Sequence, residues 1–251
     1  MKKFIIANWK MNPQTLAEAK RIFNATKLGV KNIRNIEVVI CPPFVCLDNL
    51  QQATGNLKLG AQNCFFEEKG AFTGEISPLI LKDLGVEYVI LGHSERRRIF
   101  NEDDEIINKK IKLVLKEKLK PIFCIGENQK QKNQEKTFEV LKKQVLKGLT
   151  GVSRKLVKNL IIAYEPVWAI GSGKSCQSSY AQTVNIFLKK IISQKYGRKT
   201  AQTTPILYGG SVNSENVLPY FREAGMVGVL VGGASLNTKE FIKIIKTVSK
   251  A

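Results

Sequence analysis

The chain has 251 residues, of which 43% are hydrophobic, and this suffices for one large α/β domain or two small ones. Forty lysines and arginines against 21 acids give a formal net charge of +19. The basic residues are spread along helical segments, with no interleaved aromatic side chains and no nucleic-acid motif. We therefore expect a lysine-rich surface that attracts anionic metabolites, with nucleic acid an unlikely partner. No apolar run approaches the ~20 residues of a membrane span, so no membrane partner is expected.

Cysteine and histidine usage narrows the chemistry further. The five cysteines are odd in number and form no C-x-x-C pair. They are typical of small buried hydrophobes in a reducing cytoplasm, without disulfides or a zinc ribbon. Histidine occurs once, at position 93, which excludes multi-histidine metal sites. Any acid–base chemistry by an imidazole must use His93, and we expect no metal and no cofactor.

Short apolar runs recur along the chain and have the composition of strands buried on both faces of a parallel sheet. We predict eight such strands: Lys3–Trp9, Ile36–Cys41, Leu57–Ala61, Tyr88–Leu91, Pro121–Ile125, Leu160–Tyr164, Pro205–Tyr208 and Gly228–Val231. Patterns of helical period lie between them, at Thr15–Leu28, Glu102–Leu119, Phe138–Leu149, Ala181–Tyr196 and Thr238–Val248.

Eight strands alternating with helices over this length favour a (β/α)8 TIM barrel, with eight parallel strands ringed by helices and residues 1–251 as a single domain. A doubly wound sheet is the structural alternative. That fold usually carries a Gly-rich turn after its first strand, and Asn8-Trp9-Lys10-Met11-Asn12-Pro13 has no glycine.

The rarer polar residues fall at the carboxyl ends of the predicted strands, where barrel enzymes place their active groups. Glu165 follows an apolar strand, and partial desolvation there makes a carboxylate a better base. His93 precedes a predicted helix start, and a helix N-terminus favours neutral imidazole that donates a hydrogen bond. Taken singly, Glu165 is better explained by a strand-end salt bridge, and a structural role for His93 is as acceptable as a chemical one.

Two further features suit an anionic substrate. Lys10 supplies a fixed positive charge after the first strand, although a surface lysine is the default in so basic a chain. Gly209-Gly210-Ser211 and Gly232-Gly233 follow the last two strands, where glycines let backbone N–H groups approach a phosphate. Simple tight turns are the alternative for these glycines.

The segment after Glu165 has the composition of a lid. It begins with Pro166, continues through the apolar Val167, Trp168, Ala169 and Ile170, and ends in Gly171, Ser172, Gly173 and Lys174. A stiff start and a glycine-rich end allow an apolar tip to close as a rigid flap. The last residues imitate a P-loop, but Trp168 stands where that motif needs glycine, so we reject nucleotide binding.

Seven stretches together closely resemble the triosephosphate isomerase family over essentially the whole chain. They are Asn8–Asn12, Gly60–Asn63, Gly92–Arg97, Cys124–Glu127, Ala163–Gly171, Tyr208–Val212 and Val231–Leu236. One departure is that Cys176-Gln177-Ser178-Ser179 lacks the Thr-Pro-Glu often found in the family, which predicts weaker capping of the next helix.

The resemblance implies interconversion of dihydroxyacetone phosphate and D-glyceraldehyde 3-phosphate, in glycolysis and gluconeogenesis, without a cofactor. Glu165 would be the base and neutral His93 the acid, with Lys10 stabilising the enediolate and Asn8 orienting the substrate. The resemblance also implies that the phosphate is held by the backbone of Gly171, Ser211, Gly232 and Gly233, and it gives Glu95 and Tyr208 supporting positions.

The resemblance further implies a homodimer formed through the 62–77 loop. Phe72, Thr73 and Glu75 lie in this loop, and Thr73 would reach the partner's active site near Lys10 and Glu95. Adjacent phenylalanines at 65 and 66 are hard to explain on an exposed monomer loop, although a loop packed internally is the alternative.

Two competing hypotheses remain open. A Schiff-base aldolase would need a desolvated lysine, and Lys10 is the only lysine that we place at an inner strand end, but Glu165 and His93 then have no purpose. A basic barrel that binds polyanions would explain the charge, but not the presence of Asn8, Lys10, His93 and Glu165 together.

Overall fold

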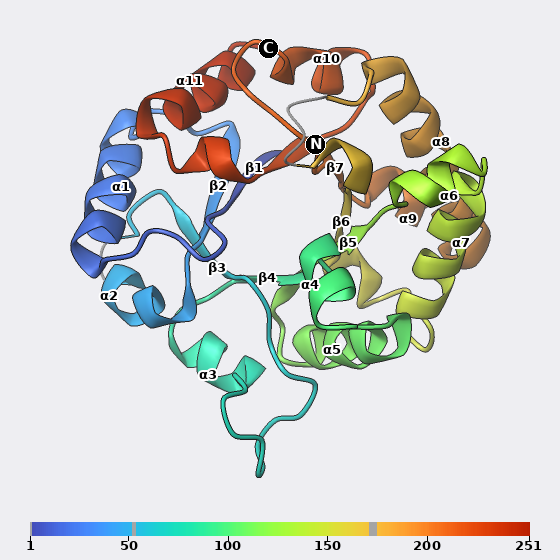
Figure 1. Ribbon diagram of the computed structural model, residues 1–251, viewed down its shortest axis with the longest axis horizontal. Helices are drawn as coiled ribbons and strands as arrows, with labels where there is room; N and C mark the ends of the chain where they lie inside the picture. The colour runs from blue at the N-terminus through green and yellow to red at the C-terminus, as the bar shows by residue number, and fades with distance from the viewer. Residues whose placement is uncertain (1, 52–53, 171–174) are drawn as a thin grey trace.

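The computed structural model describes residues 2–51, 54–170 and 175–251. Its eight strands form a closed, all-parallel barrel in the order β1 to β8, ringed by helices (Figure 1). The strands are β1 Lys3–Asn8, β2 Ile36–Cys41, β3 Lys58–Ala61, β4 Tyr88–Leu91, β5 Lys120–Ile125, β6 Ile161–Tyr164, β7 Ile206–Tyr208 and β8 Gly228–Val231. The predicted TIM barrel is confirmed.

The helices cover the outside of the barrel. They are α1 Leu16–Gly29, α2 Leu47–Gln51, α3 Pro78–Asp83, α4 Ser94–Ile99, α5 Asp104–Lys116, α6 Gln129–Asn133, α7 Thr137–Gly148, α8 Ser178–Tyr196, α9 Arg198–Thr203, α10 Val217–Arg222 and α11 Thr238–Ser249. Four 3-10 turns, η1 Phe44–Cys46, η2 Val157–Asn159, η3 Val167–Ala169 and η4 Gly233–Ser235, complete the described elements.

The core has two layers because successive strand side chains alternate in direction. Ile6, Ile90 and Ile122 belong to the cluster that fills the barrel, whereas Ile5 and Ala7 belong to the layer between strands and helices. Both faces of every strand are therefore buried, and this explains the continuous apolar runs in the sequence. The five cysteines are free and buried, as predicted.

The predicted bounds of β2, β4 and β8 are confirmed, and the other predicted elements differ by one to three residues at one or both ends. The helix predicted over Glu102–Leu119 begins at Asp104, because the Asp103 side chain caps it by accepting from the N–H groups of Glu105 and Ile106. That helix ends at Lys116, and Lys118 then takes a φ of +65°. Gln177 precedes α8 and provides no side-chain cap, so the weaker capping predicted there is confirmed.

The 62–77 loop projects from the body of the barrel before α3 (Figure 1). Phe72, Thr73 and Glu75 are exposed in it, and Phe72 retains 42% of its accessible surface. Phe65 packs against Phe66 and Phe72, with ring centroids 4.1 and 4.6 Å apart. The three rings thus support one another and still leave apolar surface at the tip.

No helix in the described ranges 2–51, 54–170 and 175–251 has both the length and the apolar composition needed to cross a membrane.

Candidate active site

A cavity of about 270 Å³ lies at the carboxyl ends of the barrel strands. It brings together residues that follow five different strands, because parallel strands all end at the same rim. The lining residues are Asn8, Lys10, His93, Glu165, Ile170, Gly209, Gly210, Ser211, Val212, Leu230, Gly232, Gly233 and Ala234. The predicted catalytic residues and most of the predicted phosphate-binding residues therefore share one cavity.

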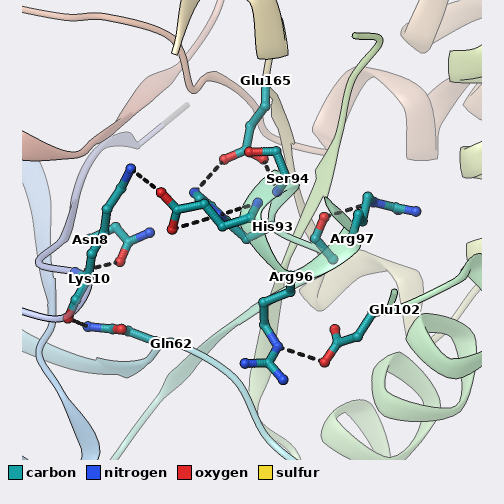
Figure 2. A network of polar contacts seen from close by, with 11 residues as sticks. Asn8, Lys10, Gln62, His93, Ser94, Arg96, Arg97, Glu102 and Glu165 are labelled. Carbon is teal, nitrogen blue, oxygen red and sulfur yellow. Dashed lines mark hydrogen bonds and ion pairs between the residues drawn. The ribbon is translucent and has the colours of Figure 1, made fainter. Parts of the chain in front are cut away.

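Glu165 lies directly after β6 and is only 2% exposed. Its Oε2 accepts a hydrogen bond of 2.9 Å from the backbone N–H of Ser94. Its Oε1 lies 3.0 Å from Nε2 of His93. Figure 2 shows the two carboxylate oxygens facing these two neighbours, His93 and Ser94.

His93 is the N-cap residue of α4, and its Nδ1 accepts from the backbone N–H of Glu95 at 3.2 Å. A ring nitrogen that accepts a hydrogen bond carries no proton, so this contact favours the neutral tautomer with hydrogen on Nε2. Burial lowers the pKa of His93, but the negative charges of Glu165 and Glu95 outweigh it and raise the pKa above the ordinary 6.5. The helix N-terminus by itself predicts a neutral imidazole. In the substrate-free protein, the adjacent carboxylates of Glu165 and Glu95 favour the protonated imidazole instead.

Lys10 reaches the cavity from an unusual backbone conformation. Its φ is +55°, in the left-handed region that non-glycine residues rarely adopt. The backbone N–H of Lys10 donates to Oδ1 of Asn8 at 3.1 Å, and Gln62 Nε2 donates to the Lys10 carbonyl at 2.8 Å. Lys10 Nζ donates to Oε1 of Glu95 at 2.6 Å. These contacts fix the backbone on both sides of Lys10 and direct its ammonium across the mouth of the barrel (Figure 2).

Glu95, expected as a supporting residue, links His93 to the ammonium of Lys10. Partial burial raises the pKa of its carboxyl group, but the hydrogen bond from Lys10 and the charges of His93 and Lys10 lower that pKa below the usual 4.5. Glu95 therefore remains ionised in the working range, and its charge holds Lys10 in place. This ion pair also argues against a Schiff-base role, because an ammonium that donates to a carboxylate is not a free amine nucleophile.

The glycines that line the cavity differ in how closely other atoms approach them. A Cβ on Gly209 would lie 2.9 Å from Cγ of Glu165, so only glycine lets that base stand in its observed place. A Cβ on Gly232 would lie 3.5 Å from Cε of Lys10, whereas one on Gly233 would meet none of the described residues within 4 Å. Gly232 and Gly233 thus present backbone to the same space as the lysine. Gly171, the remaining predicted phosphate-binding residue, lies outside the described residues.

The first part of the predicted lid is held by a buried carboxylate. After Pro166, the residues Val167–Ala169 form a 3-10 turn, and Trp168 Nε1 donates to Glu127 at 2.8 Å. Burial raises the pKa of Glu127, although hydrogen bonds from Trp168 and Tyr164 offset part of that rise. Ser172, Gly173 and Lys174, also predicted for the lid, lie outside the described residues.

Two contacts join β7 and the residues after it to the lid and to the chain just beyond the lid. Ser211 Oγ donates to the carbonyl of Ala169 at 2.7 Å, while Ile170 lines the cavity. The hydroxyl of Tyr208 accepts from the N–H of Cys176 at 3.0 Å, beyond the far end of the lid. Tyr208, predicted as a supporting residue, therefore contacts the chain just beyond the lid.

Sequence reasoning missed the supporting roles of Gln62 and Glu127, although both fall in the matching stretches. It also missed how α4 is fixed. Arg97 Nε donates to the carbonyl of Gly92 at 2.8 Å, and its Nη1 donates to Asp104 at 2.7 Å. Arg96 Nε donates to Glu102 at 2.6 Å. The arginines in the Gly92–Arg97 stretch were the available signal, because partly buried arginines need partners.

In the described part of the chain, no group of three or more histidine, cysteine, aspartate or glutamate side chains is arranged to hold a metal ion.

Comparison with known proteins identifies relatives along almost the whole chain. The family model described as triosephosphate isomerase matches residues 3–248. A triosephosphate isomerase of Alkaliphilus oremlandii is 50% identical over 248 residues, covering 98% of this chain and 99% of the relative. Those of Alkaliphilus metalliredigens and Dictyoglomus turgidum are 46% and 45% identical, with the same coverage.

Proposed function

Since this chain belongs to the triosephosphate isomerase family, we propose that it interconverts dihydroxyacetone phosphate and D-glyceraldehyde 3-phosphate through an enediolate, in glycolysis and gluconeogenesis. The observation that carries the proposal is the pairing of Glu165 and His93. A buried carboxylate and an imidazole, 3.0 Å apart, face one cavity with a lysine on its other side.

Glu165 is the proposed base. Its carboxylate removes a proton from the hydroxyl-bearing carbon next to the substrate carbonyl; the electron pair of that C–H bond forms the C=C bond of the enediolate, and the C=O π pair moves to the carbonyl oxygen. The same carboxyl group returns the proton to the former carbonyl carbon, while the proton of the substrate hydroxyl passes to the former carbonyl oxygen with His93 as the acid, so the base is regenerated and no co-reactant is used.

His93 is the proposed acid. With hydrogen on Nε2, the ring donates to the oxygen that acquires charge in the enediolate. Substrate has to enter between His93 and Glu165, and the carboxylate has to leave the N–H of Ser94 to reach the substrate carbon. Separating the two side chains also removes the nearest negative charge from the imidazole, which favours its neutral form.

Lys10 and Asn8 supply the other polar side chains of the proposed site. The ammonium of Lys10 stabilises the negative charge of the substrate and the enediolate, and Asn8, which is 5% exposed, orients the substrate. Backbone N–H groups at Gly171, Ser211, Gly232 and Gly233 are proposed to bind the phosphate. Closure of residues 166–174 would exclude water, which strengthens these electrostatic interactions and protects the reactive enediolate.

We further propose that residues 1–251 act as one barrel domain in the cytoplasm and as a homodimer through the 62–77 loop. The exposed Phe72 supports an interface at the loop tip, as does the exposure of Met11 and Val45, which retain 85% and 84% of their surface. Thr73, beside Phe72, would approach Lys10 and Glu95 of the partner. Five buried thiols are consistent with a reducing compartment.

The test is turnover of D-glyceraldehyde 3-phosphate by the wild type, Glu165→Gln and a matched control, Glu215→Gln, at an exposed position. We expect fast turnover by the wild type and the control. In Glu165→Gln, kcat should be reduced at least about 10³-fold. Equal rates for wild type and Glu165→Gln would remove Glu165 as the base. A folded wild type without turnover would overturn the proposed function.

A further inference from the structure

The net positive charge of the chain is concentrated in its second half, where acidic residues are fewer. Residues 140–214 contain twelve lysines and arginines, and Glu165, buried in the catalytic cavity, is the one acidic residue among them. Surface formed by this segment therefore has no carboxylates of its own to neutralise it. The proposed isomerase chemistry uses none of these basic residues outside the lid.

Part of this segment lines a second cavity, of about 620 Å³. Its lining residues are Arg154, Lys155, Lys158, Lys199, Thr200 and Thr203. The first three lie in or beside η2, immediately before β6, and the others lie in α9, immediately before β7. Because these segments lead into the amino ends of their strands, the cavity lies at the opposite end of the barrel from Glu165.

Arg154 is held in a defined position in this cavity. Its Nε donates to Oγ1 of Thr200 at 3.3 Å, and Thr200 is only 2% exposed. The guanidinium group also lies over Gly197, where an added Cβ would be 3.5 Å from Nη2. With Nε occupied, the two terminal nitrogens of Arg154 remain as a fork of donors, the arrangement that suits phosphate oxygens.

The cations of this cavity are not neutralised within the protein. Among the described residues, no ion pair joins Arg154, Lys155, Lys158 or Lys199 to a carboxylate, although other lysines and arginines form twelve ion pairs in the described structure. Four like charges around one hollow repel one another, and that repulsion disfavours the folded state. An anion with several charges relieves it most effectively.

We infer that the cavity lined by Arg154, Lys155, Lys158 and Lys199 is a binding site for a linear oligophosphate, distinct from the catalytic cavity. Four cations match an anion with three or more negative charges better than a single phosphate. Among the residues that the structure describes, the lining includes no aromatic ring on which a nucleobase could stack, so recognition is directed at the phosphate chain itself.

The test is calorimetric titration of the full chain with inorganic tripolyphosphate at about 0.1 M salt, where charges on a diffuse surface are largely screened. The test variant is Arg154→Gln with Lys199→Gln. The matched control is Lys20→Gln with Lys31→Gln, which removes the same charge from exposed positions in and after α1. Circular dichroism and isomerase activity establish that each variant is folded.

We expect saturable binding of one tripolyphosphate per chain, weakened about tenfold or more in the Arg154/Lys199 variant and unchanged in the control. Isomerase activity should be retained by both variants, since neither alters the catalytic cavity. Orthophosphate should bind at least about tenfold more weakly than tripolyphosphate.

Three outcomes would overturn the inference. Equal weakening in both variants would mean that only net charge attracts the anion. Undiminished binding in the Arg154/Lys199 variant would place the ligand elsewhere, including the catalytic cavity. Binding of a nucleoside triphosphate much more tightly than tripolyphosphate would assign a nucleotide site, whereas equal affinities would support recognition of the phosphate chain.

Discussion

The backbone N–H of Ser94 holds one carboxylate oxygen of Glu165 at 2.9 Å, and the residue before Ser94 faces the other oxygen. The first turn of α4 therefore contacts both oxygens of the proposed base before substrate is present. Proton transfer requires this carboxylate to exchange two contacts with the protein for contacts with the substrate. In the substrate-free protein, the Glu165 carboxylate is thus already bound by Ser94 and His93, and substrate has to displace these contacts.

The single histidine allows the first prediction to be checked without assignment experiments. In the substrate-free protein, the imidazole pKa should lie above 6.5, because the charges of Glu165 and Glu95 outweigh burial. Glu165→Gln should lower that pKa, since burial then acts against a smaller opposing charge. A pH titration of the imidazole resonances by NMR measures both values, and an unchanged pKa in the variant would contradict the pairing.

The same shift has a consequence for stability. The folded pKa of His93 is raised above 6.5, so its pairing stabilises the substrate-free fold fully below about pH 6.5. This contribution is lost as the pH rises through the folded pKa. Wild type and Glu165→Gln should therefore differ in the pH dependence of unfolding over that window, as measured by urea denaturation.

Lys10→Met should separate catalysis from stability. Loss of the ammonium should lower kcat/KM about 10²-fold or more, because the enediolate loses a fixed positive charge. The free energy of unfolding should change by only about 1 kcal/mol, since the ion pair with Glu95 is partly exposed. Lys20→Met, on the exposed face of α1, is the matched control and should retain full activity. A large loss of stability in Lys10→Met would indicate a structural role.

Trp168→Phe should weaken the anchor of the lid. The change removes the N–H that donates to Glu127, a residue with no exposed surface, and should cost about 1–3 kcal/mol of stability. Adding Glu127→Gln should cost less in this background than in the wild type, because the carboxylate has already lost a donor. Urea denaturation of the two single variants and the double variant measures this coupling. Strictly additive costs would mean that the contact contributes nothing.

Phe72→Ser should shift the protein from dimer to monomer and reduce its activity. The side chain is 42% exposed at the tip of the projecting loop, and its replacement removes apolar surface expected at the interface. Ile186→Ser, on α8, removes a more exposed apolar side chain outside the loop and should leave the oligomeric state unchanged. Sedimentation velocity distinguishes these outcomes. A wild type that sediments as a monomer would contradict the proposed interface.

The strands and the longer helices were predictable because their burial is periodic. Short helices such as α2, α3 and α9 were not, since five or six residues contain fewer than two turns and show no period. The left-handed backbone of Lys10 depends on Asn8 and Gln62, which meet it only after the barrel closes. Likewise, the contact between Glu127 and Trp168 joins residues 41 positions apart.

The position of α4 has one more implication, for any attempt to transfer this chemistry. His93 and Ser94 are consecutive residues at the start of one short helix, and Arg97 ties that helix to Gly92 and Asp104. The start of α4 therefore carries the imidazole and also holds the carboxylate that β6 supplies. Grafting Glu165 and His93 alone onto another barrel would reproduce the two groups without the helix that holds both of them. The unit to transfer is therefore α4 together with Arg97, which ties this helix to Gly92 and Asp104.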